Sequence, residues 1–273
     1  MTFISKHLTA QLDGIARLYH YQPFRQDDPV HVERLVSVLN ENKLRCSDPR
    51  NFNDRWDCRP WFDTSYIETD AVARAGLAEY IIGLEPDGST HERLRNDPFF
   101  LEESLLRLAD VYPELIYRQC AMYCLTANAR SILMWTHYAD NHRGICLEYG
   151  CGKSEFGVAV KVVYTDEYPL WRPHQLDEIL DILLTKSNVW AYEEEYRLVI
   201  PRATVEHYPC LVDADDFMML IPNTLKSIIV GMDGNYDAVA DLARRYAPGL
   251  PVNFVTQNRS KFELALFQGK HQG

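Results

Sequence analysis

The segment Trp190–Ile200, WAYEEEYRLVI, begins polar and ends apolar, a pattern that predicts a strand. Side chains on a strand alternate between two faces, so Glu193, Glu195 and Arg197 are expected on one face and Glu194 on the other. The pair Glu193 and Glu195 could do electrostatic or general-base work in a cleft. Arg197 could instead neutralise one carboxylate at a structural strand edge. The segment alone leaves both interpretations open.

The composition is that of an ordinary globular protein, with 273 residues, 47% hydrophobic and 25% charged. The formal net charge is −11. We expect no general nucleic-acid-binding surface, because such surfaces neutralise phosphates with Lys and Arg. A local basic cleft around Arg130, Arg143 and Arg197 stays open. No stretch approaches the roughly 20 apolar residues of a membrane span, so no membrane partner is expected.

The seven cysteines are scattered along the chain, an odd number without a Cys-x-x-Cys pair. This pattern is typical of a reducing cytoplasm, where most thiols act as small hydrophobic residues. We therefore expect a cytoplasmic protein without a metal site.

The apolar pattern predicts an α+β fold with one central mixed sheet, in a single domain over residues 1–273. Residues 66–119 are expected to form a helical insertion. Asp28 can cap a helix that begins at Pro29. The tail, over 225–255, predicts a strand–helix–strand unit. Strands are also expected at 17–21, 44–46, 121–125, 144–149, 158–164, 193–200 and 262–266, and helices at 131–139 and 176–185.

The opening strand contains a histidine between two tyrosines. Tyr19 and Tyr21 share one strand face, and His20 points to the other. His20 is expected either as a structural residue with satisfied hydrogen bonds or as a neutral imidazole that bonds a ligand.

The segment Met134–Gly144 is rich in aromatic, histidine and arginine residues where a helix passes to a strand. Such connections commonly carry function. Trp135 and Tyr138 are expected either in the core or in a site. The Asn and Asp residues of Phe52–Asp57 predict a turn.

Four segments, in order, resemble the bacterial family called domain of unknown function 2971. They are Leu18–Tyr21, Phe52–Asp57, Met134–Tyr149 and Trp190–Arg197. The tail segment Leu225–Gly231 is also similar to the family pattern, so the resemblance spans nearly the full chain. Arg55 departs from the pattern, which has proline at that place.

The order of the motifs is also similar to the ADP-ribosyltransferase superfamily, whose fold has a split central sheet. The similarity implies that His20, Tyr138 and Glu195 hold the three motif positions, with Glu193 as the first glutamate of the pair. Glu195 would stabilise the positive charge that builds on the ribose when NAD is cleaved. Glu193 would orient or activate the acceptor.

The same similarity implies NAD as a substrate. Tyr138 or Tyr19 would stack on the nicotinamide, and Arg143 or Arg130 would pair with the pyrophosphate. Aromatic and polar side chains near the motif positions would bind NAD: His20, Tyr19, Arg143, Trp135 and Arg197.

Three functions are therefore considered. The first is an ADP-ribosyltransferase-like enzyme that transfers ADP-ribose to a protein or nucleic-acid acceptor, or hydrolyses NAD, in a toxin or phage-defence setting. The second is a non-catalytic sensor or protein-interaction module whose motif residues are mutually buried: Trp135, His137, Glu195 and Arg197. The third is a metal-dependent nuclease that uses Glu193 and Glu195.

The arrangement of the side chains separates the first two functions. A cleft lined by His20, Tyr138 and Glu195 favours the enzyme. Burial with satisfied partners favours the sensor or interaction module.

Overall fold

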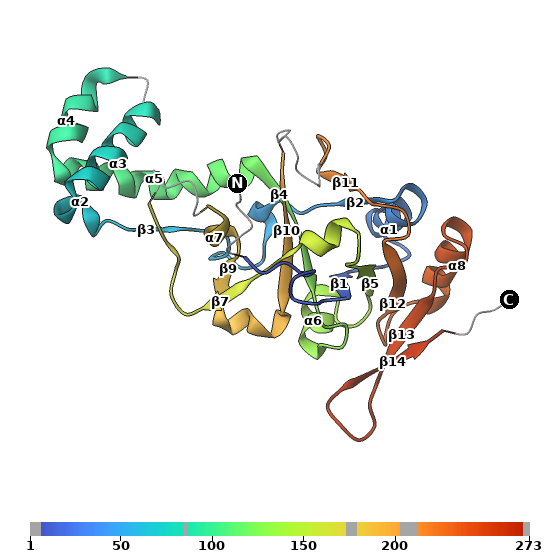
Figure 1. Ribbon diagram of the computed structural model, residues 1–273. Coiled ribbons are helices and arrows are strands. Elements are labelled where there is room, and N and C mark those ends of the chain that lie inside the picture. The colour runs from blue at the N-terminus through green and yellow to red at the C-terminus, as the bar shows by residue number, and fades with distance from the viewer. Residues whose placement is uncertain (1–6, 85–86, 173–178, 203–211, 270–273) are drawn as a thin grey trace. The chain divides into compact units, whose positions relative to one another are not determined.

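The computed structural model (Figure 1) describes residues 7–84, 87–172, 179–202 and 212–269. The chain divides into two compact units. Unit 1 consists of residues 1–3, 49–119 and 163–188, and unit 2 of residues 4–48, 120–162 and 189–273. The α+β class is confirmed, and the single domain expected over residues 1–273 stays a prediction.

Unit 2 is built on a mixed eight-stranded sheet with the order β14-β13-β12-β5-β1-β4-β10-β6. All neighbours in it are antiparallel except β12 and β13, which are parallel and joined by helix α8. The strands are β1 Arg17–Gln22, β4 Cys120–Thr126, β5 Ile145–Gly150, β6 Val160–Lys161, β10 Glu195–Pro201, β12 Leu225–Val230, β13 Val252–Gln257 and β14 Leu264–Gln268.

Among the described residues, unit 2 also contains three α-helices and a small antiparallel sheet. They are α1 Pro29–Glu41, α6 Ile132–Tyr138, α8 Tyr236–Tyr246, and strands β2 Lys43–Arg45 and β11 Phe217–Met219. The helix expected at Pro29 is confirmed: the Asp28 carboxylate accepts hydrogen bonds from the amides of Val30 and His31. Asn42, with a φ of 51°, ends it in a left-handed conformation. The strand–helix–strand unit expected in the tail is also confirmed.

Helices cover both faces of this sheet. Leu18 and Leu147 belong to a buried cluster that includes side chains of α1 and α8. Tyr21 and Cys146 belong to a second buried cluster, which includes Trp135 of α6. The two faces are therefore called the α1/α8 face and the α6 face.

Unit 1 contains the helices expected within 66–119. They are α2 Tyr66–Thr69, α3 Ala71–Leu84, α4 His91–Asn96 and the long α5 Pro98–Gln119. The described part of the unit also contains two parallel strand pairs: β3 Trp61–Phe62 with β8 Leu170–Trp171, and β7 Val163–Thr165 with β9 Thr185–Ser187. Helix α7 spans Ile179–Leu183; of the helix expected at 176–185, residues 176–178 lie outside the described residues.

Two expected strands differ from the structure. The one expected at 158–164 is divided into β6 in unit 2 and β7 in unit 1. The one expected at 193–200 begins only at Glu195, because a 3-10 helix, Asn188–Glu193, precedes it. Across the described ranges, no helix is long and apolar enough to cross a membrane.

Candidate functional site

A row of polar side chains crosses five strands on the α6 face. Directly paired residues of antiparallel strands place their side chains on the same face of the sheet. The paired residues of this row, from β12 to β10, are Ser227, Glu148, Tyr19, Thr126 and Glu195. Tyr19 packs against the same buried cluster as Tyr138 of α6. The register therefore brings Tyr19 and Glu195 to one face, and Tyr138 packs on the same face from α6.

Glu195 and Arg197 form a buried ion pair on β10. Their side chains are 6% and 0% exposed. Arg197 donates from Nε to Oε1 of Glu195 at 2.8 Å and from Nη2 to Oε2 at 2.9 Å. Residues two apart on a strand share a face, which makes this geometry available. Both oxygens of the proposed catalytic carboxylate are thus bound by one guanidinium.

Glu193 lies before β10 and not on it, in contrast to the expectation. It is the last residue of the 3-10 helix, and Glu194 follows it with a φ of 46°. A non-glycine residue in this left-handed region costs about 1–2 kcal/mol and breaks strand alternation. The prediction that Glu193 belongs to the same strand as Glu195, and shares a face with it for that reason, was therefore wrong, although both side chains are buried.

Tyr138 holds the Glu193 carboxylate. Its hydroxyl donates to Oε1 of Glu193 at 2.5 Å. Tyr138 and Tyr192 are partly buried and pack against the α6-face cluster. Two of the proposed catalytic residues, Glu193 and Tyr138, are therefore in direct contact.

His20 lies on the opposite face of the sheet. It pairs with Leu147 in the α1/α8 cluster, and its ring stacks on Tyr123 with centroids 4.2 Å apart. Its Nδ1 donates to the carbonyl of Cys124 at 2.8 Å. Burial lowers the pKa of His20 from 6.5 to about 4, so the ring is neutral at pH 7. The expectation that His20, Tyr138 and Glu195 line one cleft was wrong.

Trp135 is a core residue. Its side chain is fully buried, packs edge-on against Tyr21 at 5.0 Å, and donates from Nε1 to the carbonyl of Ala129 at 3.0 Å. A ring enclosed in this way offers no free face to a nicotinamide. The expectation that Trp135 binds NAD is therefore not supported by its position.

Arg143 belongs to the turn between α6 and β5. Its guanidinium donates to the Asp140 carbonyl at 3.0 Å and to Oδ1 of Asp140 at 2.7 Å. Arg143 is two residues before Ile145, the first residue of β5, and Ile145 pairs with Gln22 of β1. Gln22 lies three residues, about 10 Å, along β1 from Tyr19. Arg143 is thus bound within its own turn, displaced along the sheet from the row that contains Glu195.

The turn itself is shaped by close backbone packing. Asp140, Asn141 and His142 have φ values of 47°, 51° and 65°. A Cβ on Gly144 would lie 2.4 Å from the carbonyl oxygen of Gln22. Only glycine allows this approach. His142 and Gly144 thus have a structural role in the turn.

Glu148 is the site residue that the sequence reasoning missed. It accepts a hydrogen bond from Ser227 and forms an ion pair with Arg17 at 3.1 Å. The pKa of the neighbouring Tyr19 is raised, first because its hydroxyl is desolvated by burial and second because of the negative charge of Glu148. Tyr19 therefore stays protonated at pH 7. A single acid in the apolar strand expected at 144–149 was the signal that could have found it.

The Phe52–Asp57 motif lies in unit 1 and forms the expected turn. The Asp54 carboxylate accepts the amide of Trp56 at 2.9 Å. Asp57 forms a buried ion pair with Lys186 at 3.6 Å. The motif therefore anchors the fold of unit 1.

Comparisons with family models, with curated proteins and with solved structures give no match. The resemblances to domain of unknown function 2971 and to the ADP-ribosyltransferases therefore stay predictions. Over the part of the chain that the structure describes, no group of three or more His, Cys, Asp or Glu side chains is placed to hold a metal ion.

Proposed function

We propose that unit 2 is a binding module, a sensor or a protein-interaction domain, with a closed polar network that consists of two hydrogen-bonded pairs, Glu195 with Arg197 and Glu193 with Tyr138. The observation that carries the proposal is the Glu195–Arg197 pair, in which both carboxylate oxygens accept guanidinium N–H groups and neither side chain exceeds 6% exposure. A carboxylate that stabilises a ribosyl cation has to face the reacting sugar. Here Glu195 faces Arg197.

The network supports a module of one defined conformation. A fully satisfied buried network rigidifies the elements that it joins. Glu193 ties the segment before β10 to α6 through Tyr138, and Glu195 ties the start of β10 to Arg197. A ligand or partner that contacts α6 or the β4–α6 connection would therefore act on an ordered surface.

The second candidate is the ADP-ribosyltransferase-like enzyme, with NAD as substrate and a protein or nucleic acid as acceptor. The Tyr138–Glu193 contact favours it, because it places a hydroxyl and a carboxylate together on the face that also carries Tyr19 and Glu195. In this reaction Glu193 would act on the acceptor. The role implied for His20 would fall to another residue.

The test measures nicotinamide released from NAD by the wild-type protein, by Glu193→Gln and by Glu194→Gln. Glu194 is exposed and supplies the matched control. A binding module releases no nicotinamide above the buffer rate in any of the three. Release by the wild type and by Glu194→Gln, lost in a folded Glu193→Gln protein, would overturn the proposal in favour of the enzyme.

A further inference from the structure

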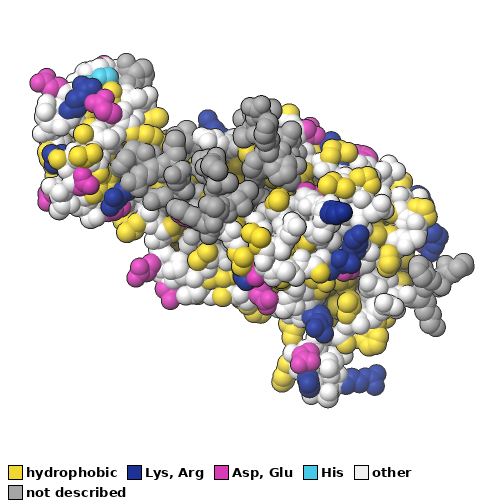
Figure 2. Space-filling view, in the orientation of Figure 1, with side chains coloured by type: hydrophobic (Ala, Val, Ile, Leu, Met, Phe, Trp, Pro, Cys, Tyr) yellow, Lys and Arg dark blue, Asp and Glu magenta, His cyan; other side chains and the backbone are white. Residues whose placement is uncertain are grey.

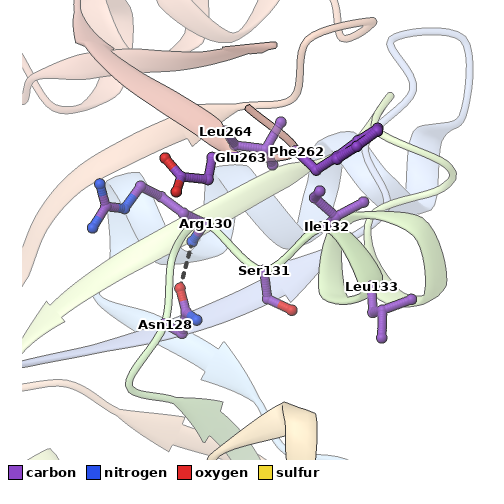
Figure 3. A pocket seen from close by; sticks show the side chains of 8 residues that line it. All are labelled: Asn128, Arg130, Ser131, Ile132, Leu133, Phe262, Glu263 and Leu264. Atoms are coloured by element: carbon purple, nitrogen blue, oxygen red, sulfur yellow. Dashed lines mark hydrogen bonds between the residues drawn. The ribbon is translucent and has the colours of Figure 1, made fainter. Parts of the chain in front are cut away.

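A pocket of about 400 Å³ opens on unit 2 between the β4–α6 connection and the β13–β14 loop (Figure 3). Its volume is within the range of small-molecule sites. Its lining combines apolar, polar and charged side chains: Asn128, Arg130, Ser131, Ile132, Leu133, Phe262, Glu263 and Leu264. The pocket is large enough for a ligand of about the size of one nucleotide.

Buried side chains fix the wall formed by the β4–α6 connection. Tyr21 donates to the carbonyl of Asn128 at 2.8 Å, and Trp135 donates to the carbonyl of Ala129 at 3.0 Å. Oδ1 of Asn128 accepts the amide of Arg130 at 2.9 Å, the bond drawn in Figure 3. The backbone of this wall is therefore preorganised, which lowers the entropy cost of binding.

The second wall is an ordered turn. Oδ1 of Asn258 accepts the amide of Ser260 at 2.9 Å, and the amide of Asn258 donates to the carbonyl of Glu263 at 2.9 Å. This turn presents Phe262 to solvent with 99% of its surface exposed. Figure 3 shows its ring beside Ile132, on the opposite side of the pocket from the Arg130 guanidinium. An exposed aromatic ring on an ordered turn is suited to stacking on a planar ligand.

Three cations lie at this pocket or on the turn that carries Phe262, in a protein whose net charge is −11. Arg130 lines the pocket, and Arg259 and Lys261 lie on the turn with Phe262; all three are exposed. Within the described residues none of the three forms an ion pair. Figure 2 shows basic side chains at the projecting end of unit 2 where this turn lies. Cations and an exposed aromatic ring at one pocket are a pattern by which proteins bind phosphate and base together.

We propose that this pocket binds a nucleotide, either free or within a single-stranded nucleic acid. The base stacks on Phe262, and the phosphate lies against Arg130 with Arg259 and Lys261 nearby. Glu263 accepts hydrogen bonds, which favours a base with an amino group over inorganic phosphate. The inference names the ligand class of the proposed binding module and rests on that proposal.

The test measures fluorescence anisotropy of fluorescein-labelled single-stranded DNA and RNA, with nucleoside monophosphates as competitors. We expect binding at low salt that Phe262→Ala weakens by about 5–150-fold, the effect of losing one stacked base. Arg130→Ala weakens binding and lowers the slope of log K against log salt by about 0.7, the share of one phosphate contact. Phe99→Ala and Arg55→Ala, at exposed positions of unit 1, leave binding unchanged, and circular dichroism shows that all variants are folded.

Competition by monophosphates supports the free nucleotide, and binding of strands without such competition supports the nucleic acid. The proposal is overturned if neither the strands nor the nucleoside monophosphates bind, or if Phe262→Ala leaves the binding unchanged. Binding to anionic vesicles that depends on Phe262, without binding to either strand, also overturns it. Failure here leaves the nicotinamide measurement untouched, so the ligand class and the binding role are tested separately.

Discussion

Removing one hydroxyl group tests whether Tyr138 holds the Glu193 carboxylate. Tyr138→Phe deletes the donor of a 2.5 Å hydrogen bond to an acceptor residue that is 2% exposed. Leaving a buried acceptor without its donor costs about 1–3 kcal/mol, so the free energy of unfolding should fall by about that amount. The ring remains, so the packing against the α6-face cluster is kept.

Urea unfolding followed by circular dichroism measures this change. An unchanged m-value with a lower midpoint assigns the loss to stability. Tyr19→Phe is the control, because Tyr19 packs against the same cluster and has no hydroxyl hydrogen bond among the described residues. Equal unfolding free energies, within about 0.5 kcal/mol, for Tyr138→Phe and the wild type would refute the reasoning.

Two further predictions concern His20 and the turn at Gly144. The pKa of His20 falls from 6.5 to about 4 on folding, so its contribution to stability is complete above pH 6.5 and is lost as the pH falls towards 4. The difference in unfolding free energy between the wild type and His20→Asn should therefore shrink from pH 7 to pH 4.5, and a constant difference would contradict the prediction. Gly144→Ala should lower the free energy of unfolding by about 1–3 kcal/mol, because the added Cβ would lie 2.4 Å from the carbonyl oxygen of Gln22. Gly152→Ala, with open space around the Cβ, should leave the thermal midpoint nearly unchanged; equal midpoints for the two variants would count against the packing argument.

Local sequence signals predicted the elements that local interactions determine. The helix α1 follows from the carboxylate of Asp28 and the fixed φ of Pro29, both adjacent in the chain. The parallel unit β12–α8–β13 follows from two apolar strands around an amphipathic helix. The strand β10 could be recognised, whereas its start could not, because the left-handed φ of Glu194 is not determined by the residue type.

The site depended on strand pairing, which a single sequence does not determine. Alternation placed Tyr19 and His20 on opposite faces of β1, but it could not say which of these faces Glu195 shares. The register resolves this point, since Thr126 pairs with both Tyr19 and Glu195. The motif order is therefore compatible with two arrangements, and the one observed separates His20 from Glu195.

The most direct test of the closed network is a double-mutant cycle at Glu195 and Arg197. Glu195→Gln or Arg197→Met alone leaves a buried group without its charged partner and should cost about 3–5 kcal/mol of unfolding free energy. Replacing both removes the two charges together, so the double variant should be more stable than either single variant. If a single variant does not fold, recovery of folding in the double variant gives the same answer. The claim that the two side chains form one buried pair would be contradicted if the double variant lost as much unfolding free energy as the two single variants together, within about 0.5 kcal/mol.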